Sequence, residues 1–235
     1  MAFAALADNL ARVRDEIARA QAAEGWRHDV RIVAVTKGHA PEAVQAAFQA
    51  GLHDVGENRV QEGLEKREAA GAVPVRWHLI GHLQTNKAKH VPGAFALVHS
   101  VDSWRVAEAL GGGVRKAAER SGRTSTLEVL LQVNLAGEEQ KSGCAPEEAP
   151  GLATRIAALP ELKLHGLMTM APFTDDERVQ RRVFRQLREL RDQIVAGGPA
   201  LPELSMGMSG DFRAAVAEGA TMLRLGTILF GERPQ

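Results

Sequence analysis

The sequence has no tyrosine and a single cysteine, Cys144, among its 235 residues. One cysteine excludes an internal disulfide, and Cys144 lacks the neighbouring residues that would mark it as a nucleophile. No apolar run approaches the roughly 20 residues that a membrane-spanning helix needs. The N-terminus also lacks the basic-then-apolar pattern of a signal peptide. These absences predict a cytoplasmic protein that makes no contact with a membrane.

Charge of either sign is not in excess, because Lys+Arg and Asp+Glu both total 29. Neutral net charge does not favour nucleic acid as a partner. The segment from Asp175 to Val195 is rich in arginine, but its apolar residues recur at helical spacing, so we expect the arginines on the solvated side of an outer helix. No cluster of His, Cys and Asp has metal-ligand spacing, and we therefore expect no metal site.

The first 25 residues have the pattern of an amphipathic helix. Leu6, Leu10, Val13 and Ile17 recur at spacings of three and four, and Gly25 provides a stop. We expect this helix to pack on the domain that follows.

After this helix the chain alternates short apolar runs with helical patterns. The eight runs are RIVAV, HDVG, RWHLI, ALVHS, LEVLLQV, KLHGLM, ELSM and MLRLG. Helical segments are expected at Pro41–Ala50, Arg59–Ala69, Ser103–Ser121, Pro146–Leu159 and Asp175–Val195. Eight strands separated by helices predict a single α/β domain over residues 1–235, a (β/α)₈ TIM-type barrel with an extra N-terminal helix. A doubly wound open sheet is the alternative, because periodicity does not show whether a sheet closes.

In a barrel, the C-terminal ends of the strands form the functional face. These ends carry mostly small, polar or ionisable residues: Thr36-Lys37, Gly56-Glu57-Asn58, Gly81-His82, Ser100, Asn134, Met168, Met206 to Gly210 and Gly226-Thr227. The location predicts a binding site there.

The last two of these ends have the composition of a phosphate site. Ser209, Gly226 and Thr227 would bring backbone N–H groups close to an anion in the loops after strands seven and eight, where barrels often bind phosphate. Ordinary turn glycines and a serine cap are the alternative explanation.

Lys37 follows the first buried strand. A partly desolvated lysine amine can form a Schiff base with a carbonyl, although a single lysine at a strand end more often extends to water. A phosphate loop together with an inward lysine indicates a phosphorylated aldehyde cofactor or a phosphorylated sugar.

Six blocks extend this pattern over nearly the whole chain. They are VAVTKGHAPEAVQAAFQAGLHDVGENRVQEGLEK, WHLIGHLQTNKAK, VHSVDS, VNLAGEEQKSG, GLMTMAP and LSMGMSGDFRAAVAEGATMLRLGTILFGER. In this order they resemble the YggS/PROSC family of pyridoxal 5′-phosphate (PLP) homeostasis proteins. The resemblance implies the alanine racemase N-terminal barrel without that enzyme's second domain, and PLP as the cofactor.

The resemblance also implies residue roles. Lys37 matches the lysine that forms the Schiff base with PLP, and Arg224 matches the arginine that faces the pyridine nitrogen. Asn58 matches a residue that lines the ring site, with Met206 to Met208 nearby. The implied phosphate-binding residues are Ser209, Gly226 and Thr227.

Two further positions concern accessory roles. Lys141 matches a second family lysine implicated in PLP handling. Where many members have a lysine two positions beyond the Schiff-base lysine, this chain has His39.

The chemistry implied by these residues is modest. A permanently charged arginine at the ring nitrogen keeps that nitrogen unprotonated and makes PLP a weak electron sink. The related racemase uses a tyrosine as its second acid/base, and this chain has none. His82 is a candidate base, although structural hydrogen bonding is the expected role of His78 and His82.

We therefore expect a PLP-binding protein of PLP homeostasis or carriage with no catalytic residue. An amino-acid racemase is the first alternative, and a phosphosugar isomerase or aldolase is the second. The resemblance suggests a monomer and PLP-requiring apo-enzymes as partners.

Overall fold

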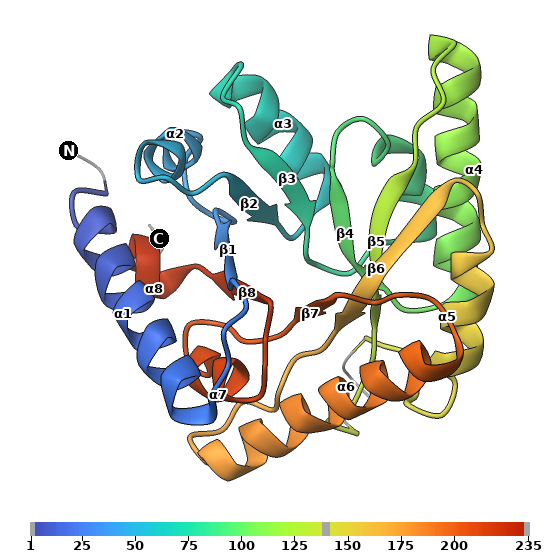
Figure 1. Ribbon diagram of the computed structural model, residues 1–235. Helices are drawn as coiled ribbons and strands as arrows, with labels where there is room; N and C mark the ends of the chain where they lie inside the picture. The colour runs from blue at the N-terminus through green and yellow to red at the C-terminus, as the bar shows by residue number, and fades with distance from the viewer. Residues whose placement is uncertain (1–2, 138–141, 233–235) are drawn as a thin grey trace.

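Eight parallel strands form a closed barrel in the computed structural model, which describes residues 3–137 and 142–232 (Figure 1). Each strand pairs with the next one in sequence, and the last pairs with the first. The strands are β1 (Arg31–Val35), β2 (Asp54–Glu57), β3 (Arg76–Leu79), β4 (Leu97–Val101), β5 (Leu127–Gln132), β6 (Leu162–Met168), β7 (Glu203–Ser205) and β8 (Met222–Leu225). Closure confirms the predicted barrel and excludes the open sheet.

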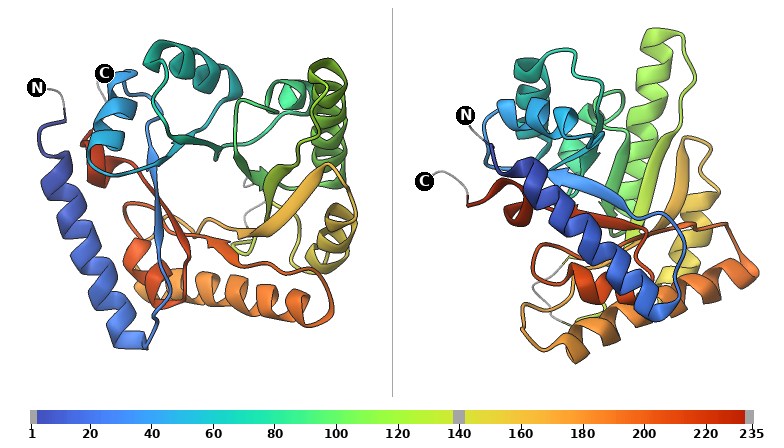
Figure 2. Two further views of the ribbon diagram at one scale, coloured as in Figure 1. Left: turned by 45° about the horizontal axis from the view of Figure 1, so that its top comes forward. Right: turned by 60° about the vertical axis from the view of Figure 1, so that its left-hand side comes forward.

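The helices lie outside the ring of strands (Figure 2). They are α1 (Leu6–Glu24), α2 (Glu42–Gln49), α3 (Val60–Ala70), the 3₁₀ helix η1 (Thr85–His90), α4 (Trp104–Ser121), α5 (Ala149–Ala157), α6 (Glu177–Gly197), α7 (Phe212–Ala217) and α8 (Thr227–Phe230). The predicted helical segments are present with small shifts at their ends. In the described part of the chain, no helix is both long enough and apolar enough to cross a membrane.

Helix α1 packs across the outside of the barrel against α7 and α8 (Figures 1 and 2). The Asn9 side chain donates to the Leu229 carbonyl at 2.9 Å, and Arg213 forms an ion pair with Glu16 at 2.6 Å. Gly25 ends the helix in the left-handed conformation at φ 76°, as the sequence predicted. The residues of the predicted apolar stripe are all buried: Leu6, Leu10, Val13 and Ile17.

The interior of the barrel is unusually polar. Most apolar strand residues belong to the large core between the sheet and the helices, whereas a separate small cluster consists of Leu97, Leu130, Met168 and Met222. Other buried strand positions carry polar side chains, and these include His78, His99, Gln132, Ser205 and Arg224. Because barrel interiors are usually filled by branched apolar residues, this polar set suggests a functional requirement.

On helix α6, three arginines share a carboxylate partner that the sequence did not predict. Arg181 and Arg185 donate to Glu218 at 2.7 and 2.9 Å, and Arg188 lies 3.4 Å from the same carboxylate. Glu218 is only 2% exposed, and the Arg188 guanidinium also lies over the Trp26 ring. These three arginines therefore anchor α6 to the turn after α7. Arg185 is exposed, as predicted, whereas Arg181 and Arg188 are partly buried, which corrects the prediction for these two.

Gly166 allows β6 and β7 to approach closely. A Cβ atom at Gly166 would lie 1.9 Å from the carbonyl oxygen of Glu203. We expect Gly166→Ala to lower the free energy of unfolding by about 1–3 kcal/mol, because the strands must separate. In the control, Gly112→Ala on α4, a Cβ meets nothing within 4 Å, and stability should rise by about 0.5–1 kcal/mol. Urea denaturation measures both, and equal effects would contradict the packing argument.

Candidate functional site

The predicted binding residues lie on one arc of four adjacent strands. Lys37 follows β1, Asn58 follows β2, Ser209 follows β7 and Gly226 follows β8. The strands pair in the order β7, β8, β1 and β2, so the four residues lie along one part of the C-terminal rim. A Cβ atom on Gly226 would lie 3.4 Å from the Val35 carbonyl oxygen, so the loop after β8 contacts the end of β1.

Lys37 lies in a tight turn at the end of β1, where its side chain is partly buried. The N–H of His39 donates to the Thr36 carbonyl at 3.0 Å, and Gly38 has φ 72°, a conformation that favours glycine. The N–H of Gly38 donates to Glu62 at 2.9 Å. These contacts hold the backbone on both sides of Lys37.

A buried polar cluster supports this turn. Thr36 donates from its hydroxyl to Glu57 Oε1 at 2.6 Å, and Lys66 donates to the same oxygen at 2.6 Å. Lys66 also donates to the Thr36 carbonyl at 2.6 Å. Burial raises the pKa of Glu57, although the hydrogen bonds from Lys66 and Thr36 oppose the rise. The cluster fixes the last residue before Lys37.

Our sequence interpretation did not identify Lys66. It lies on the buried face of α3 at three-residue spacing from Gly63 and Val60, and that spacing was a detectable signal. In the structure Glu57 bonds Thr36 and Lys66, whereas Asp211 accepts from the Met208 N–H at 2.5 Å.

His39, which stands where many family members have a lysine, packs in an aromatic cluster. Its ring is 7% exposed and lies 5.8 Å from Phe3 and 5.3 Å from Phe230, measured between ring centroids. Phe3 and Phe230 contact each other edge to face. This aromatic cluster joins the segment before α1 and the end of α8 to the turn that carries Lys37.

The loops after β7 and β8 meet at Ser209. Its hydroxyl oxygen accepts from the N–H groups of Gly226 and Ile228 at 3.4 and 3.3 Å. Both bonds are long, so these N–H groups are weakly satisfied and suited to stronger acceptors such as phosphate oxygens. Thr227, the first residue of α8, is exposed beside them.

The two methionines of the loop after β7 have different environments. Met208 is 37% exposed, whereas Met206 is fully buried within the core between sheet and helices. Gly207 lies between them at φ 94°, and a Cβ there would lie 2.6 Å from that of Ala215. Met208 is therefore the methionine that is accessible at the rim.

Arg224 lies inside the barrel near the same rim. One terminal nitrogen, Nη1, donates to the carbonyl and the hydroxyl of Ser205 at 2.8 and 2.7 Å, and Nη2 donates to the Thr169 carbonyl at 2.9 Å. Burial lowers the pKa of Arg224 to about 10, against the opposing charge of Asp211. At neutral pH this group remains a cation with a fixed orientation.

Asn58 and Ser100 have well-defined neighbours. A Cβ atom on Gly81 would lie 2.3 Å from the Asn58 carbonyl oxygen, so the ends of β2 and β3 come together only at a glycine. Ser100 donates to the Gly81 carbonyl at 2.6 Å. It was expected at a strand end, but β4 continues through Val101 and Ser100 is 1% exposed.

Of the two proposed accessory residues, the structure describes His82. The His82 side chain is 56% exposed, with its Nδ1 atom 3.5 Å from Asp102 and 3.3 Å from the Ser142 hydroxyl. Lys141 lies outside the described residues. Within the described ranges, no group of three or more His, Cys, Asp or Glu residues is arranged to hold a metal ion.

Together these residues can bind a small phosphorylated carbonyl compound. The loops after β7 and β8 carry N–H groups and hydroxyls of the kind that bind phosphate, and Lys37 carries an amine after the adjacent strand. Arg224 supplies a buried cation.

Comparisons with known proteins agree with this chemistry. The model of the alanine racemase N-terminal domain family matches residues 3–234. A Pseudomonas aeruginosa protein named pyridoxal phosphate homeostasis protein is 43% identical over 229 residues, which are 97% of this chain and 96% of the relative.

Solved structures extend the comparison. PipY of Synechococcus elongatus, solved with PLP bound, is 35% identical with a TM-score of 0.82, and the match covers 96% of this chain and all of PipY. An alanine racemase of Clostridium difficile is 17% identical with a TM-score of 0.74. That match covers 97% of this chain and 58% of the racemase, and it shows a shared fold alone.

Proposed function

Because this chain belongs to the family of pyridoxal phosphate homeostasis proteins, which have the alanine racemase N-terminal domain, we propose that it binds PLP and acts in PLP homeostasis. The observation that supports this proposal is the contact between the loop after β8, which carries Gly226, and the end of β1, which precedes Lys37. Lys37 would hold PLP through its amine, a group that can bond covalently to a carbonyl compound.

The residues at the rim fit the cofactor. Ser209, Gly226 and Thr227 would bind the phosphate, because the two N–H groups that Ser209 accepts from are only weakly bonded. Arg224 would face the ring nitrogen, and Asn58 and Met208 would line the ring. Bound PLP supplies an electrophilic carbon and an electron sink. Lys141 and His82 are accessory candidates for PLP handling.

The same residues support a carrier with little or no turnover. Arg224 is a permanent cation at neutral pH, so it cannot donate a proton to the ring nitrogen and raise its electron demand. The racemase tyrosine has no counterpart, because the sequence contains no tyrosine. The relatives' name also favours homeostasis over racemisation.

The wider role follows from the family. We place the protein in the cytoplasm as a monomer, with PLP as its ligand and PLP-requiring apo-enzymes as recipients. Residues 1–235 form one PLP-binding domain in this proposal. Neither a membrane nor nucleic acid is a partner.

Absorption spectroscopy and borohydride reduction test the proposal. Purified protein mixed with PLP should acquire a visible absorption band, and reduction should add the mass of one cofactor per chain. Protein that binds no PLP covalently would contradict the proposal. A carrier should show no enzyme-like exchange of amino-acid Cα protons in deuterated solvent, whereas rapid exchange would support the racemase. Trapping that needs a sugar phosphate in place of PLP would indicate an aldolase or isomerase.

A further inference from the structure

A buried chain of side chains connects Arg224 to the opposite end of the barrel. Ser205 contacts Arg224 at 2.7 Å and His99 Nδ1 at 2.8 Å, and His99 Nε2 lies 2.9 Å from His78 Nδ1. His78 Nε2 lies 2.8 Å from Asp54. Because β4 and β7 are not neighbours, the contact between His99 and Ser205 crosses the barrel interior.

Burial and charge set the protonation states along this chain. The residues His78, His99 and Ser205 are fully buried, each with 0% of its surface exposed. Burial lowers the pKa of both histidines, for His99 to well below the ordinary value, and the charges of Arg224 and Arg31 act in the same direction on His99. Both imidazoles are therefore neutral at physiological pH.

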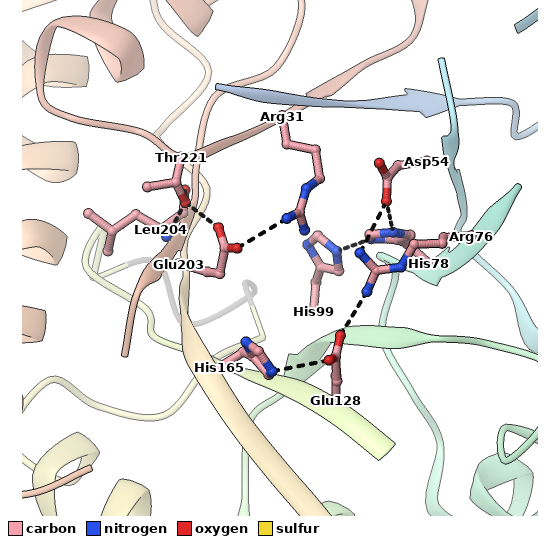
Figure 3. A network of polar contacts seen from close by, with 10 residues as sticks. All are labelled: Arg31, Asp54, Arg76, His78, His99, Glu128, His165, Glu203, Leu204 and Thr221. Carbon is pink, nitrogen blue, oxygen red and sulfur yellow. Dashed lines mark hydrogen bonds and ion pairs between the residues drawn. The ribbon is translucent and has the colours of Figure 1, made fainter. Parts of the chain in front are cut away.

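Asp54 is anionic at the far end of the chain. Burial alone would raise the pKa of Asp54, but the hydrogen bond from His78 and the charges of Arg31 and Arg76 lower it overall. Figure 3 shows His78 between Asp54 and His99, with Arg76 contacting both Asp54 and Glu128 at the base of the barrel. The chain thus has an anion at its base and the Arg224 cation at the rim.

These charge states allow one direction of hydrogen bonding. A carboxylate only accepts, so His78 donates from Nε2 to Asp54 and must accept at Nδ1. His99 then donates from Nε2 and accepts at Nδ1 from the Ser205 hydroxyl. The opposite direction would bring two nitrogen lone pairs together between the histidines or require a buried imidazolium. Consequently the Ser205 oxygen presents a lone pair to Arg224.

We propose that His78, His99 and Ser205 are positioning residues that hold Arg224 as a fixed cation against the ring nitrogen of PLP, with Asp54 as the anchoring anion. This inference rests on the proposed function. It assigns a purpose to the polar barrel interior, and sequence interpretation had given His78 only a structural role. Groups that face His99 from other strands are His78, Ser205, Arg224 and Arg31.

The first test uses the full chain without cofactor. ¹⁵N NMR of the imidazole rings at neutral pH should show His78 and His99 as neutral tautomers protonated at Nε2. In Ser205→Ala, the resonance of His99 Nδ1 should shift toward that of an unbonded nitrogen. A cationic ring, or a tautomer protonated at Nδ1, in the wild-type protein would overturn the inference.

The second test uses ¹⁵N-labelled PLP. The ring-nitrogen resonance should shift in Ser205→Ala relative to the wild type, and it should not shift in the control Ser121→Ala, an exposed serine at the end of α4 that donates to the Ala117 carbonyl. If the ring-nitrogen resonance shifts equally in both variants, or in neither, the proposed role toward PLP is wrong, even when His78 and His99 have the expected tautomers. If wild-type protein binds no PLP, the proposed function fails and the role of the chain toward PLP fails with it, while the tautomers remain measurable.

Discussion

Lys37→Ala should reduce the covalent capture of PLP by borohydride to background. The variant lacks the amine that follows the end of β1, where the Val35 carbonyl contacts Gly226 of the loop after β8. The phosphate cradle of Ser209 and Gly226 does not depend on Lys37, so the variant should retain weaker, reversible PLP binding without the visible band. Mass spectrometry after reduction measures the loss directly.

Lys116→Ala is the matched control for this experiment. Lys116 is exposed on α4, away from the strand ends of the site, and its replacement should leave the adduct intact. An undiminished adduct in Lys37→Ala would show that another lysine, such as Lys141, carries the cofactor. That outcome would refute the assigned linkage without refuting PLP binding.

Lys66→Met should destabilise the fold by about 3–5 kcal/mol, because it leaves the carboxylate of Glu57 buried without its cation. Glu57 is fully buried, and its Oε2 atom has no hydrogen-bond partner among the described residues. The Thr36 carbonyl would also lose its donor. Urea denaturation at neutral pH gives the free energy of unfolding. Lys116→Met, at the exposed site, should change it little.

The loss in Lys66→Met should depend on pH. Lys66 opposes the raised pKa of Glu57, so removing it raises that pKa further. The folded variant then binds more protons than the unfolded chain between the two pKa values, and its stability falls as pH rises. The destabilisation should therefore be smallest in acid and largest above the folded-state pKa. The double variant Glu57→Gln, Lys66→Met should recover part of the loss, and no recovery would contradict an uncompensated charge as the cause.

Local patterns in the sequence predicted much of the fold. The stripe of Leu6, Leu10, Val13 and Ile17 predicted α1 because helical periodicity and burial are expressed within a few residues. The eight apolar runs likewise correspond to the eight strands. The partial burial of Arg181 and Arg188 on α6 was missed for the complementary reason. Their partner, Glu218, is distant in sequence, and no local pattern marks such a pair.

The sequence likewise identified some residues of the candidate site and missed others. Strand-end position and the family resemblance identified Lys37, Ser209, Gly226 and Arg224 as candidates, and their proposed roles remain predictions. Lys66 could have been recognised from its spacing on α3, but its ion pair with Glu57 depends on how α3 packs against β2. His99 and Ser205 carried no local signal, because they are separated by 106 positions and meet across the barrel.

The sequence by itself determined the element order and the buried strands, since these depend on short-range spacing, and its six motif blocks carried the family resemblance. Only the tertiary structure decided that the sheet closes, that the loop after β8 lies against the end of β1, and that a chain of polar groups fills the interior. Closure brings strands from opposite sides of the ring within hydrogen-bonding distance. Burial then removes water from the polar groups, so that their protonation and bonding direction are set by each other.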